Sequence, residues 1–348
     1  MNQTLTIIGC GATGMAAAYY FTRRGFRVLL CDTPDREPFL AQIRAQGGIS
    51  LSGACGECPP VLPEALTTDF AQAMAHSGHV LMCAAADRQR LLAERCAYHA
   101  GSGHSILLCP GNFGALEVRG LLSPEVLLGE LSDNLWPCRM TGPARVLVGL
   151  PLGVKTAAAC PAGLTSRLLE RWRPLLELKA GRNVLETALN SPNVISHVAG
   201  SVLNAAGVER SNGTFAFFAD GLSPAVIRVL DGVERERDRV LEFLSLDAYA
   251  STAPLLNALM EGAPPGFEVF RTLDGPVDLK HRYISEDAQC GVALLLSVAE
   301  EYGLSVPVTR SALCLAECIN DTSYLARGRT LARYGLKGRA PKELLALI

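Results

Sequence analysis

The chain has 348 residues, more than one compact domain of about 100 to 200 residues requires, so two domains are expected. Hydrophobic residues make up 49% and charged residues 19%, a composition that excludes disordered and fibrous chains. The 32 basic and 34 acidic side chains leave a net charge of -2 and form no basic tract, so no nucleic-acid partner is expected.

The apolar stretch at residues 5–10 runs directly into a glycine-rich turn and has no basic region before it. It therefore predicts a strand and not a signal peptide. No run of about 18 apolar residues predicts a membrane span. The cysteines lie mainly in apolar runs, which is typical of thiols in a reducing compartment, so a cytoplasmic location is expected. Cys55 and Cys58 form a single CxxC without a second pair, and no metal site is predicted.

In chain order, the first half alternates short apolar runs with amphipathic stretches, the pattern of a parallel sheet with crossover helices. Strands are predicted over 4–8, 26–31, 79–84, 105–109 and 126–129, and helices over 14–24, 69–75 and 87–99. Residues 47–67 predict a small hairpin, and 145–149 a further strand. Because such crossovers are right-handed, residues 1–182 are predicted to form a doubly wound, Rossmann-type domain.

From residue 183 onward, apolar residues recur at spacings of three and four, which predicts an all-helical domain over 183–348. Long helices are expected over 225–244, 287–302 and 309–319, and a loop rich in glycine and proline over 262–275. The basic stretch at 327–339 is expected to be a solvated helix surface. The predicted fold class is thus an α/β domain followed by an all-α domain.

A glycine-rich loop follows the first predicted strand and opens the first predicted helix. It consists of Gly9, Gly11, Ala12, Thr13 and Gly14 around Cys10. The first glycine permits a tight turn, the second lets the backbone approach a pyrophosphate, and the third lets the helix pack on the sheet. The helix N-terminus offers N–H groups to the phosphates, so the loop predicts a dinucleotide site.

Asp32 ends the next predicted strand, eighteen residues after Gly14. A carboxylate at this place binds a ribose 2′-hydroxyl and repels a 2′-phosphate, which favours NAD over NADP. Arg36 lies four residues further on and leaves NADP possible, since a guanidinium pairs with phosphate. FAD is less expected because the second half has no further glycine-rich phosphate loop.

A hydride-transferring site also needs a proton donor. Four of the six histidines lie around elements of the first domain, which leaves His197 and His281 as candidates. On the residues alone, a structural role is the ordinary interpretation of either histidine.

Seven short sequence motifs along the chain resemble motifs of a known protein family. They are GCGATG at 9–14, CPGNFGALEVR at 109–119, GELSDNLWPCR at 129–139, NVLETALNSPNVISH at 183–197, FFADGLSP at 217–224, RYISED at 282–287 and GRTLARYGL at 328–336. In this order and spacing they resemble the octopine/nopaline (opine) dehydrogenase family, and within it the bacterial N-(1-carboxyethyl)-norvaline dehydrogenase type. The resemblance spans essentially the whole chain.

The resemblance implies an enzyme that joins the amino group of an L-amino acid to a 2-oxo acid, commonly pyruvate, and reduces the imine with NAD(P)H. It implies that His197 is the acid/base, that Asp287 orients and charges it, and that Arg282 holds a substrate carboxylate. Asn193, one helical turn before His197, is expected to bind substrate on the same face. Glu286 is a rival to Asp287, with an ordinary role as an acid near a helix N-terminus. The resemblance also implies a homodimer.

One loop departs from the family pattern: at the end of the strand predicted over 79–84, Ala84 opens an Ala-Ala-Ala-Asp segment where relatives carry a more Pro/His-like one. Ala84 is expected to border the cofactor. Ketopantoate reductases and glycerol-3-phosphate dehydrogenases share the glycine loop but depend on a lysine, and Lys155 and Lys280 lie in no string typical of them. A non-catalytic NAD-binding sensor or scaffold is a further alternative.

Overall fold

A computed structural model describes residues 3–348. The chain separates into two compact units, the first ending at Val184 and the second beginning at Leu185.

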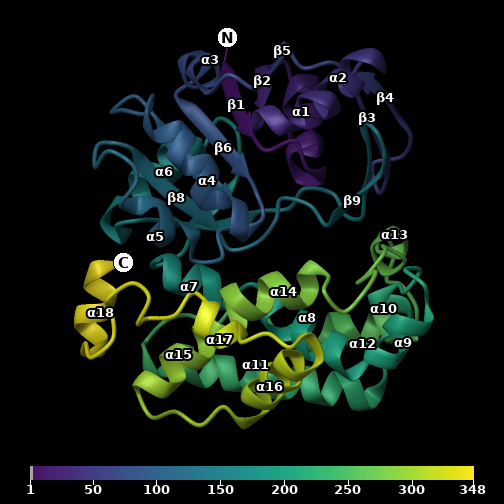
Figure 1. Ribbon diagram of the computed structural model, residues 1–348, viewed down its shortest axis with the longest axis vertical. Helices are drawn as coiled ribbons and strands as arrows, with labels where there is room; N and C mark the ends of the chain where they lie inside the picture. The colour runs from purple at the N-terminus through teal and green to yellow at the C-terminus, as the bar shows by residue number, and fades with distance from the viewer. Residues whose placement is uncertain (1–2) are drawn as a thin grey trace. The chain divides into compact units, whose positions relative to one another are not determined.

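The first unit is built on an eight-stranded sheet of order β12-β11-β8-β7-β6-β1-β2-β5 (Figure 1). The strands are β1 (Thr4–Ile8), β2 (Arg27–Cys31), β5 (Ala65–Thr67), β6 (His79–Cys83), β7 (Ser105–Cys109), β8 (Leu127–Leu131), β11 (Lys155–Ala159) and β12 (Leu178–Ala180). Six of them run parallel in the order β5-β2-β1-β6-β7-β8, whereas β11 is antiparallel to β8. This order is that of a doubly wound sheet, and it confirms the predicted Rossmann-type fold.

The chain reverses its direction of winding between β1 and β6, which are hydrogen-bonded neighbours. Ile8 at the end of β1 pairs with Cys31 at the end of β2 and with Met82 near the end of β6. The carboxyl ends of these three strands therefore lie together at one edge. In doubly wound sheets, ligands bind outside such a switch point.

Helices cover both faces of the sheet because its strands are apolar on both sides. On one face, α1 (Ala12–Arg23), together with Leu168 and Trp172 of α6 (Thr165–Trp172), shares one core with Leu5 and Ile7. On the other face lie α3 (Phe70–His76), α4 (Ala86–Ala97) and α5 (Gly114–Arg119). Thr6, which points to that side, donates a 2.7 Å hydrogen bond to the carbonyl of Ala73 in α3. The short helix α2 (Glu37–Ala45) follows β2.

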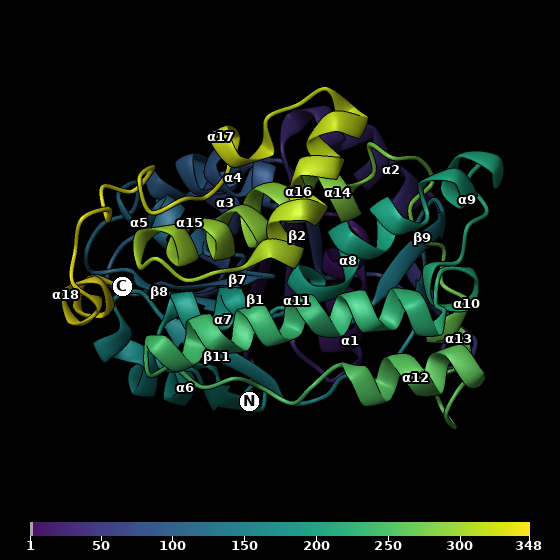
Figure 2. The same cartoon turned by 90° about the horizontal axis from the view of Figure 1, so that it is seen from below.

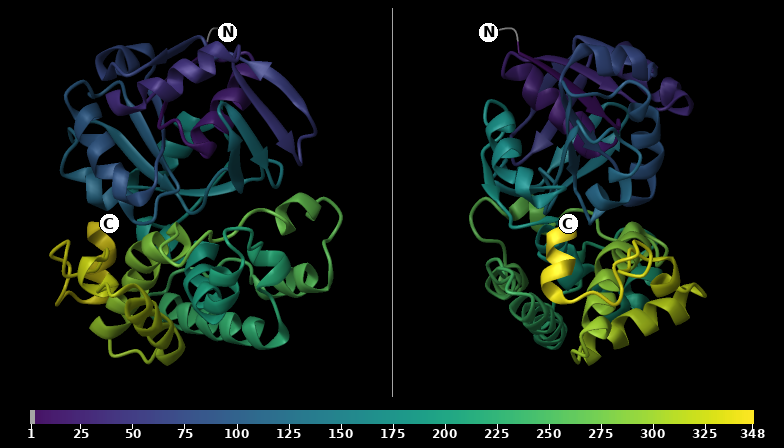
Figure 3. Two further views of the ribbon diagram at one scale, coloured as in Figure 1. Left: turned by 45° about the vertical axis from the view of Figure 1, so that its right-hand side comes forward. Right: turned by 90° about the vertical axis from the view of Figure 1, so that its left-hand side faces the viewer.

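A second sheet of four strands has the order β4-β3-β10-β9 and stands beside the large one (Figure 3). It consists of β3 (Ile49–Gly53), β4 (Cys58–Val61), β9 (Cys138–Gly142) and β10 (Arg145–Val148). Strands β3 and β4 are antiparallel, so the hairpin predicted in residues 47–67 is present. The strand predicted over 145–149 is β10, and it joins this small sheet rather than the large one.

The second unit is helical, as predicted. Its helices, including α7, which begins at the preceding Val184, are α7 (Val184–Leu189), α8 (Pro192–Leu203), α9 (Ala205–Arg210), α10 (Phe217–Asp220), α11 (Pro224–Phe243), α12 (Ala253–Glu261), α13 (Glu268–Arg271), α14 (Arg282–Asp287), α15 (Ala293–Glu301), α16 (Pro307–Asn320), α17 (Tyr324–Arg327) and α18 (Pro341–Leu347). Helix α8 is at the centre and packs against α11, α14 and α16 (Figure 2).

Two local expectations in this unit hold with one interruption each, and a third was wrong. The helix expected over 287–302 contains a π-helical turn, Ala288–Val292, between α14 and α15. The loop expected over 262–275 contains α13. Most of the basic stretch at 327–339 forms turns instead of a helix, and Arg329 within it is buried. Within residues 3–348, no helix is both long enough and apolar enough to cross a bilayer.

Candidate active site

The glycine-rich loop joins β1 to α1, and two of its glycines are sterically required. Gly9 has φ +104°, and a Cβ there would lie 2.2 Å from the carbonyl oxygen of Cys83. A Cβ on Gly14 would lie 1.8 Å from the carbonyl oxygen of Gly9, so α1 could not approach the strand. At Gly11, by contrast, a Cβ would meet no atom within 4 Å. The loop therefore packs closely on neighbouring backbone at Gly9 and Gly14 and leaves open space at Gly11, as a phosphate-binding turn needs.

Helix α1 presents an uncapped N-terminus at this loop. Gly11 is the N-cap residue and has no side chain to accept a hydrogen bond, and the first turn contains no acidic residue. Ala12 and Thr13 open the helix, and the hydroxyl of Thr13 donates a 3.4 Å hydrogen bond to Asn134 Oδ1. The N–H groups and the helix dipole favour an anion here, which fits the diphosphate of a dinucleotide.

Asp32 lies directly after β2, with a side chain only 6% exposed. Its Oδ2 accepts a 2.8 Å hydrogen bond from the N–H of Cys10, and its Oδ1 accepts one of 2.7 Å from the N–H of Thr33. Ala84, buried after β6, lies next to Cys83, whose carbonyl packs under Gly9. The structure thus brings the loop, Asp32 and Ala84 together at the switch point of the sheet.

Two arginines follow in this part of the fold, of which only Arg36 was predicted from the sequence. Arg36 ends a 3₁₀ turn, Pro34–Arg36, and its guanidinium lies over the ring of Phe39 at 5.1 Å. Arg88, in the first turn of α4, lies 3.3 Å from Asp32 Oδ1 and donates a 2.7 Å hydrogen bond to the hydroxyl of Thr33. A basic residue just after the strand predicted over 79–84 was the available signal for Arg88.

The second cluster lies on α8 and α14. His197 Nδ1 and Asp287 Oδ2 are 2.7 Å apart, although the residues are 90 positions apart in sequence. The side chains are 7% and 6% exposed, so water hardly screens the pair. The carboxylate fixes the orientation of the ring and stabilises its protonated form. Since Nδ1 is engaged by Asp287, a proton exchanged with a substrate has to be carried on Nε2.

Aromatic rings hold the imidazole in place. The ring of Tyr283 is stacked on His197 with centroids 3.5 Å apart, and Phe217 meets it edge-on at 6.1 Å. Tyr283 and Asp287 are four residues apart on α14, so they share one helix face and both reach His197. Tyr283 was not predicted as a site residue, and its position inside RYISED was the available signal.

The rival residues have other contacts. His281 is the N-cap residue of α14, and its Nδ1 accepts a 3.3 Å hydrogen bond from the N–H of Tyr283. Glu286 lies 3.9 Å from Arg282 Nε, one turn apart on the same helix. The structure therefore joins His197 to Asp287 rather than to Glu286.

The two expected substrate-binding residues lie on the helices of this pair. Arg282 is the first residue of α14, and its side chain is 42% exposed. Asn193 lies in the first turn of α8, one turn before His197 and on the same side of the helix. Arg282 and Asp287 are five positions apart, so their side chains leave α14 in directions about 140° apart.

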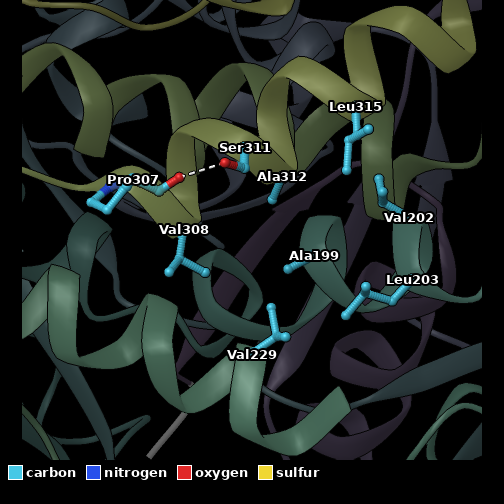
Figure 4. Close-up of a pocket in the computed structure, with 9 residues that line it drawn as sticks. All are labelled: Ala199, Val202, Leu203, Val229, Pro307, Val308, Ser311, Ala312 and Leu315. Atoms are coloured by element: carbon cyan, nitrogen blue, oxygen red, sulfur yellow. Dashed lines mark hydrogen bonds between the residues drawn. The ribbon is translucent and has the colours of Figure 1, made fainter. Parts of the chain in front are cut away.

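A separate groove of about 320 Å³ between α8, α11 and α16 does not fit a carboxylate substrate (Figure 4). Its lining includes Ala199, Val229, Val308 and Leu315, and the one polar side chain, Ser311, donates its hydrogen bond to the carbonyl of Pro307. Such a lining offers no cation to compensate for the desolvation of a carboxylate. Among residues 3–348, no three His, Cys, Asp or Glu side chains gather as a metal site requires.

Comparisons with known proteins agree with this description. Residues 180–320 match the family described as NAD/NADP octopine/nopaline dehydrogenase, alpha-helical domain. An opine dehydrogenase from Arthrobacter sp. (strain 1C) is 29% identical over 97% of this chain and 96% of its own length.

Two solved structures share the fold. An octopine dehydrogenase in complex with NADH and agmatine superposes with a TM-score of 0.74 at 16% identity, over 99% of this chain and 98% of that one. A ketopantoate reductase of Ralstonia eutropha JMP134 reaches a TM-score of 0.63 at 17% identity, over 92% and 99% of the two chains. At these identities both likenesses are of fold alone, whereas the helical unit also matches the octopine/nopaline domain in sequence. The second unit thus carries the helical domain of NAD/NADP octopine/nopaline dehydrogenases, and the chain is similar to an opine dehydrogenase along almost its whole length.

Proposed function

We propose that the protein is an opine dehydrogenase that condenses the amino group of an L-amino acid with a 2-oxo acid, with pyruvate as the first candidate. The amine adds to the oxo carbon, water leaves, and the resulting imine is reduced to a secondary amine that carries two carboxylates. The reverse oxidation belongs to the same activity. The observation that carries the proposal is the buried His197–Asp287 pair, 2.7 Å apart, in a domain of this family.

The glycine loop and Asp32 would hold the nicotinamide dinucleotide, which when bound supplies the hydride. Gly11 and the N–H groups of α1 would bind its diphosphate, and Asp32 its adenosine ribose. The open Gly11 and the uncapped helix support this assignment, because both leave backbone N–H donors for an anion.

His197 is proposed to act as general acid and base at the oxo or imine centre through Nε2. Asp287 stabilises the imidazolium that forms when the histidine takes up a proton. Arg282 is proposed to bind a substrate carboxylate, for which a guanidinium provides two parallel N–H donors. Asn193, on the same side of α8 as His197, is proposed to orient the substrate by hydrogen bonding.

The experiment that tests the function is a matrix of amino acids against 2-oxo acids, with NADH and NADPH oxidation as the readout. The proposal expects consumption of cofactor only when an amino acid and an oxo acid are both present, and a product mass equal to the two substrates less one oxygen atom. Oxidation with an oxo acid alone would indicate a simple keto-acid reductase. Cofactor binding without turnover in any combination would indicate a sensor or scaffold.

We also propose that the protein is a cytoplasmic homodimer. Thiols support a reducing compartment: Cys31, Cys83 and Cys109 are all buried in strands of the first unit. The apolar helical unit supports self-association, since Leu203 and Leu315 are 46% and 52% exposed. Light scattering at micromolar concentration is expected to give twice the monomer mass of 37.0 kDa, and a value near 37.0 kDa would refute the dimer.

A further inference from the structure

The carboxylate of Asp32 is already engaged by several donors of the protein. Oδ2 accepts from the N–H of Cys10, and Oδ1 accepts from the N–H and hydroxyl of Thr33 at 2.7 and 3.1 Å. Arg88 Nη2 lies 3.3 Å from the same Oδ1. A carboxylate so paired repels a neighbouring anion less than an isolated one does.

Arg88 acts on a second carboxylate beside Asp32. The pKa of Asp35 is lowered by the Thr33 hydroxyl and by the charges of Arg88 and Arg36. Arg88 is thus close to both carboxylates. The guanidinium of Arg88 is the one that bonds Asp32 and Thr33 directly, and its side chain is 36% exposed. It is therefore held at the position of the ribose-binding carboxylate while part of it stays accessible.

We propose that Arg88 is a specificity-determining residue which gives this site affinity for a 2′-phosphate, so that NADPH is accepted beside NADH. The inference rests on the proposed dinucleotide site. Arg88 offsets the charge of Asp32 and can donate charge-assisted hydrogen bonds to the phosphate. Removal of Arg88 leaves the charge of Asp32 without this guanidinium, which disfavours the phosphate.

Arg88 is 55 residues from Thr33 and belongs to the helix after β6, not to the loop after β2 where Arg36 lies. The choice between NADH and NADPH would then depend on residues from both the loop after β2 and the helix after β6. Arg36, by contrast, has its guanidinium over the ring of Phe39.

The test uses calorimetric titration of the full chain with 2′,5′-ADP, which carries the 2′-phosphate, and with 5′-ADP, which lacks it. Arg88→Met is expected to weaken binding of 2′,5′-ADP by about ten- to a hundredfold, the value of one or two charge-assisted hydrogen bonds. Binding of 5′-ADP should stay within about threefold, because Asp32 and the glycine loop are retained. Arg88→Lys keeps the charge but lacks the planar guanidinium. Its affinity for 2′,5′-ADP should lie between those of the native protein and of Arg88→Met.

Arg90→Met is the matched control, since Arg90 lies on the same helix and pairs with Glu94 at 3.0 Å. It should leave the affinities for both nucleotides unchanged. An equal loss of affinity for both nucleotides in Arg88→Met would overturn the proposal and show that Arg88 only supports Asp32. An unchanged affinity for 2′,5′-ADP would overturn it as well. If the unmodified protein binds neither nucleotide, the dinucleotide site itself is refuted.

Discussion

The phenol ring of Tyr283 lies almost parallel to the imidazole of His197, with 3.5 Å between the ring centroids and 11° between the planes. A stacked aromatic ring fixes the plane of the imidazole and stabilises its cationic form. Asp287 fixes the same ring at one edge through Nδ1. Tyr283 is thus a positioning residue for His197.

Replacement of this ring tests that role. Tyr283→Leu is expected to lower kcat by about two- to tenfold, the energy of one aromatic pair, while the affinity for NADH stays unchanged. Tyr283→Phe keeps the stack and should restore most of kcat. Steady-state kinetics with verified folding measure both variants. If the phenylalanine variant is as impaired as the leucine variant, the hydroxyl matters and not the stack.

Removal of the acid/base pair should abolish most turnover. His197→Ala and Asp287→Asn are each expected to lower kcat by roughly a hundred- to ten-thousandfold, because general acid and base help is lost. NADH affinity, measured by fluorescence titration, should hardly change, since the proposed cofactor contacts lie in the first unit. His281→Asn is the control, because asparagine can replace the N-cap of α14. Near-native turnover of His197→Ala would reject the assignment and direct attention to His281 and Glu286.

Arg282→Ala should act mainly on the carboxylate substrate. We expect kcat/KM to fall by about ten- to a hundredfold through a higher KM, with a fall in kcat as well if the guanidinium also aligns the imine carbon. Arg282→Lys should recover only part of the loss, since lysine lacks the planar fork. Arg310→Ala, which breaks the exposed pair with Glu300, serves as the control. An unchanged KM for both substrates in Arg282→Ala would contradict the role.

Asp32 should still give NADH the advantage in the unmodified protein, since its carboxylate can accept from the ribose diol. The ratio of kcat/KM for NADH to that for NADPH is expected to exceed one, and Asp32→Ala should reduce it. The alanine variant also leaves the N–H groups of Cys10 and Thr33 without this acceptor, so its thermal stability must be measured alongside. A ratio of one or less in the native protein would refute the preference.

The sequence predicts the strands of the Rossmann-type sheet well where apolar runs are continuous and bounded by turn residues. The bounds of β1 and β7 coincide with the prediction, because each is a short apolar run buried along almost its whole length. Strand β11 was not predicted, because its sequence KTAAA is mostly alanine, a residue that is depleted in strands. It forms through pairing with β8, which local sequence does not specify.

In the candidate site, too, local sequence patterns predict some residues, whereas others are set by tertiary packing. The loop glycines and Asp32 follow from the strand–turn–helix pattern, and the order of the family strings singles out His197 and Asp287. The stack of Tyr283 on His197 depends on how α8 packs against α14. Likewise, the contact of Arg88 with Asp32 joins two crossover connections, and periodicity in the sequence specifies neither contact.

The π-helical turn after Asp287 controls the rotational phase between α14 and α15. If all the residues of Ala288–Val292 wound as a regular α-helix, α14 would turn by roughly 100°, the rotation of one residue, relative to α15. Tyr283 and Asp287 would then swing away from His197 together, although neither residue had been changed. Gly291 lets the turn pack closely on α8, since a Cβ there would lie 2.6 Å from Val194 Cγ2. The winding of this segment is therefore as much a condition for the histidine's environment as the side chains that surround it.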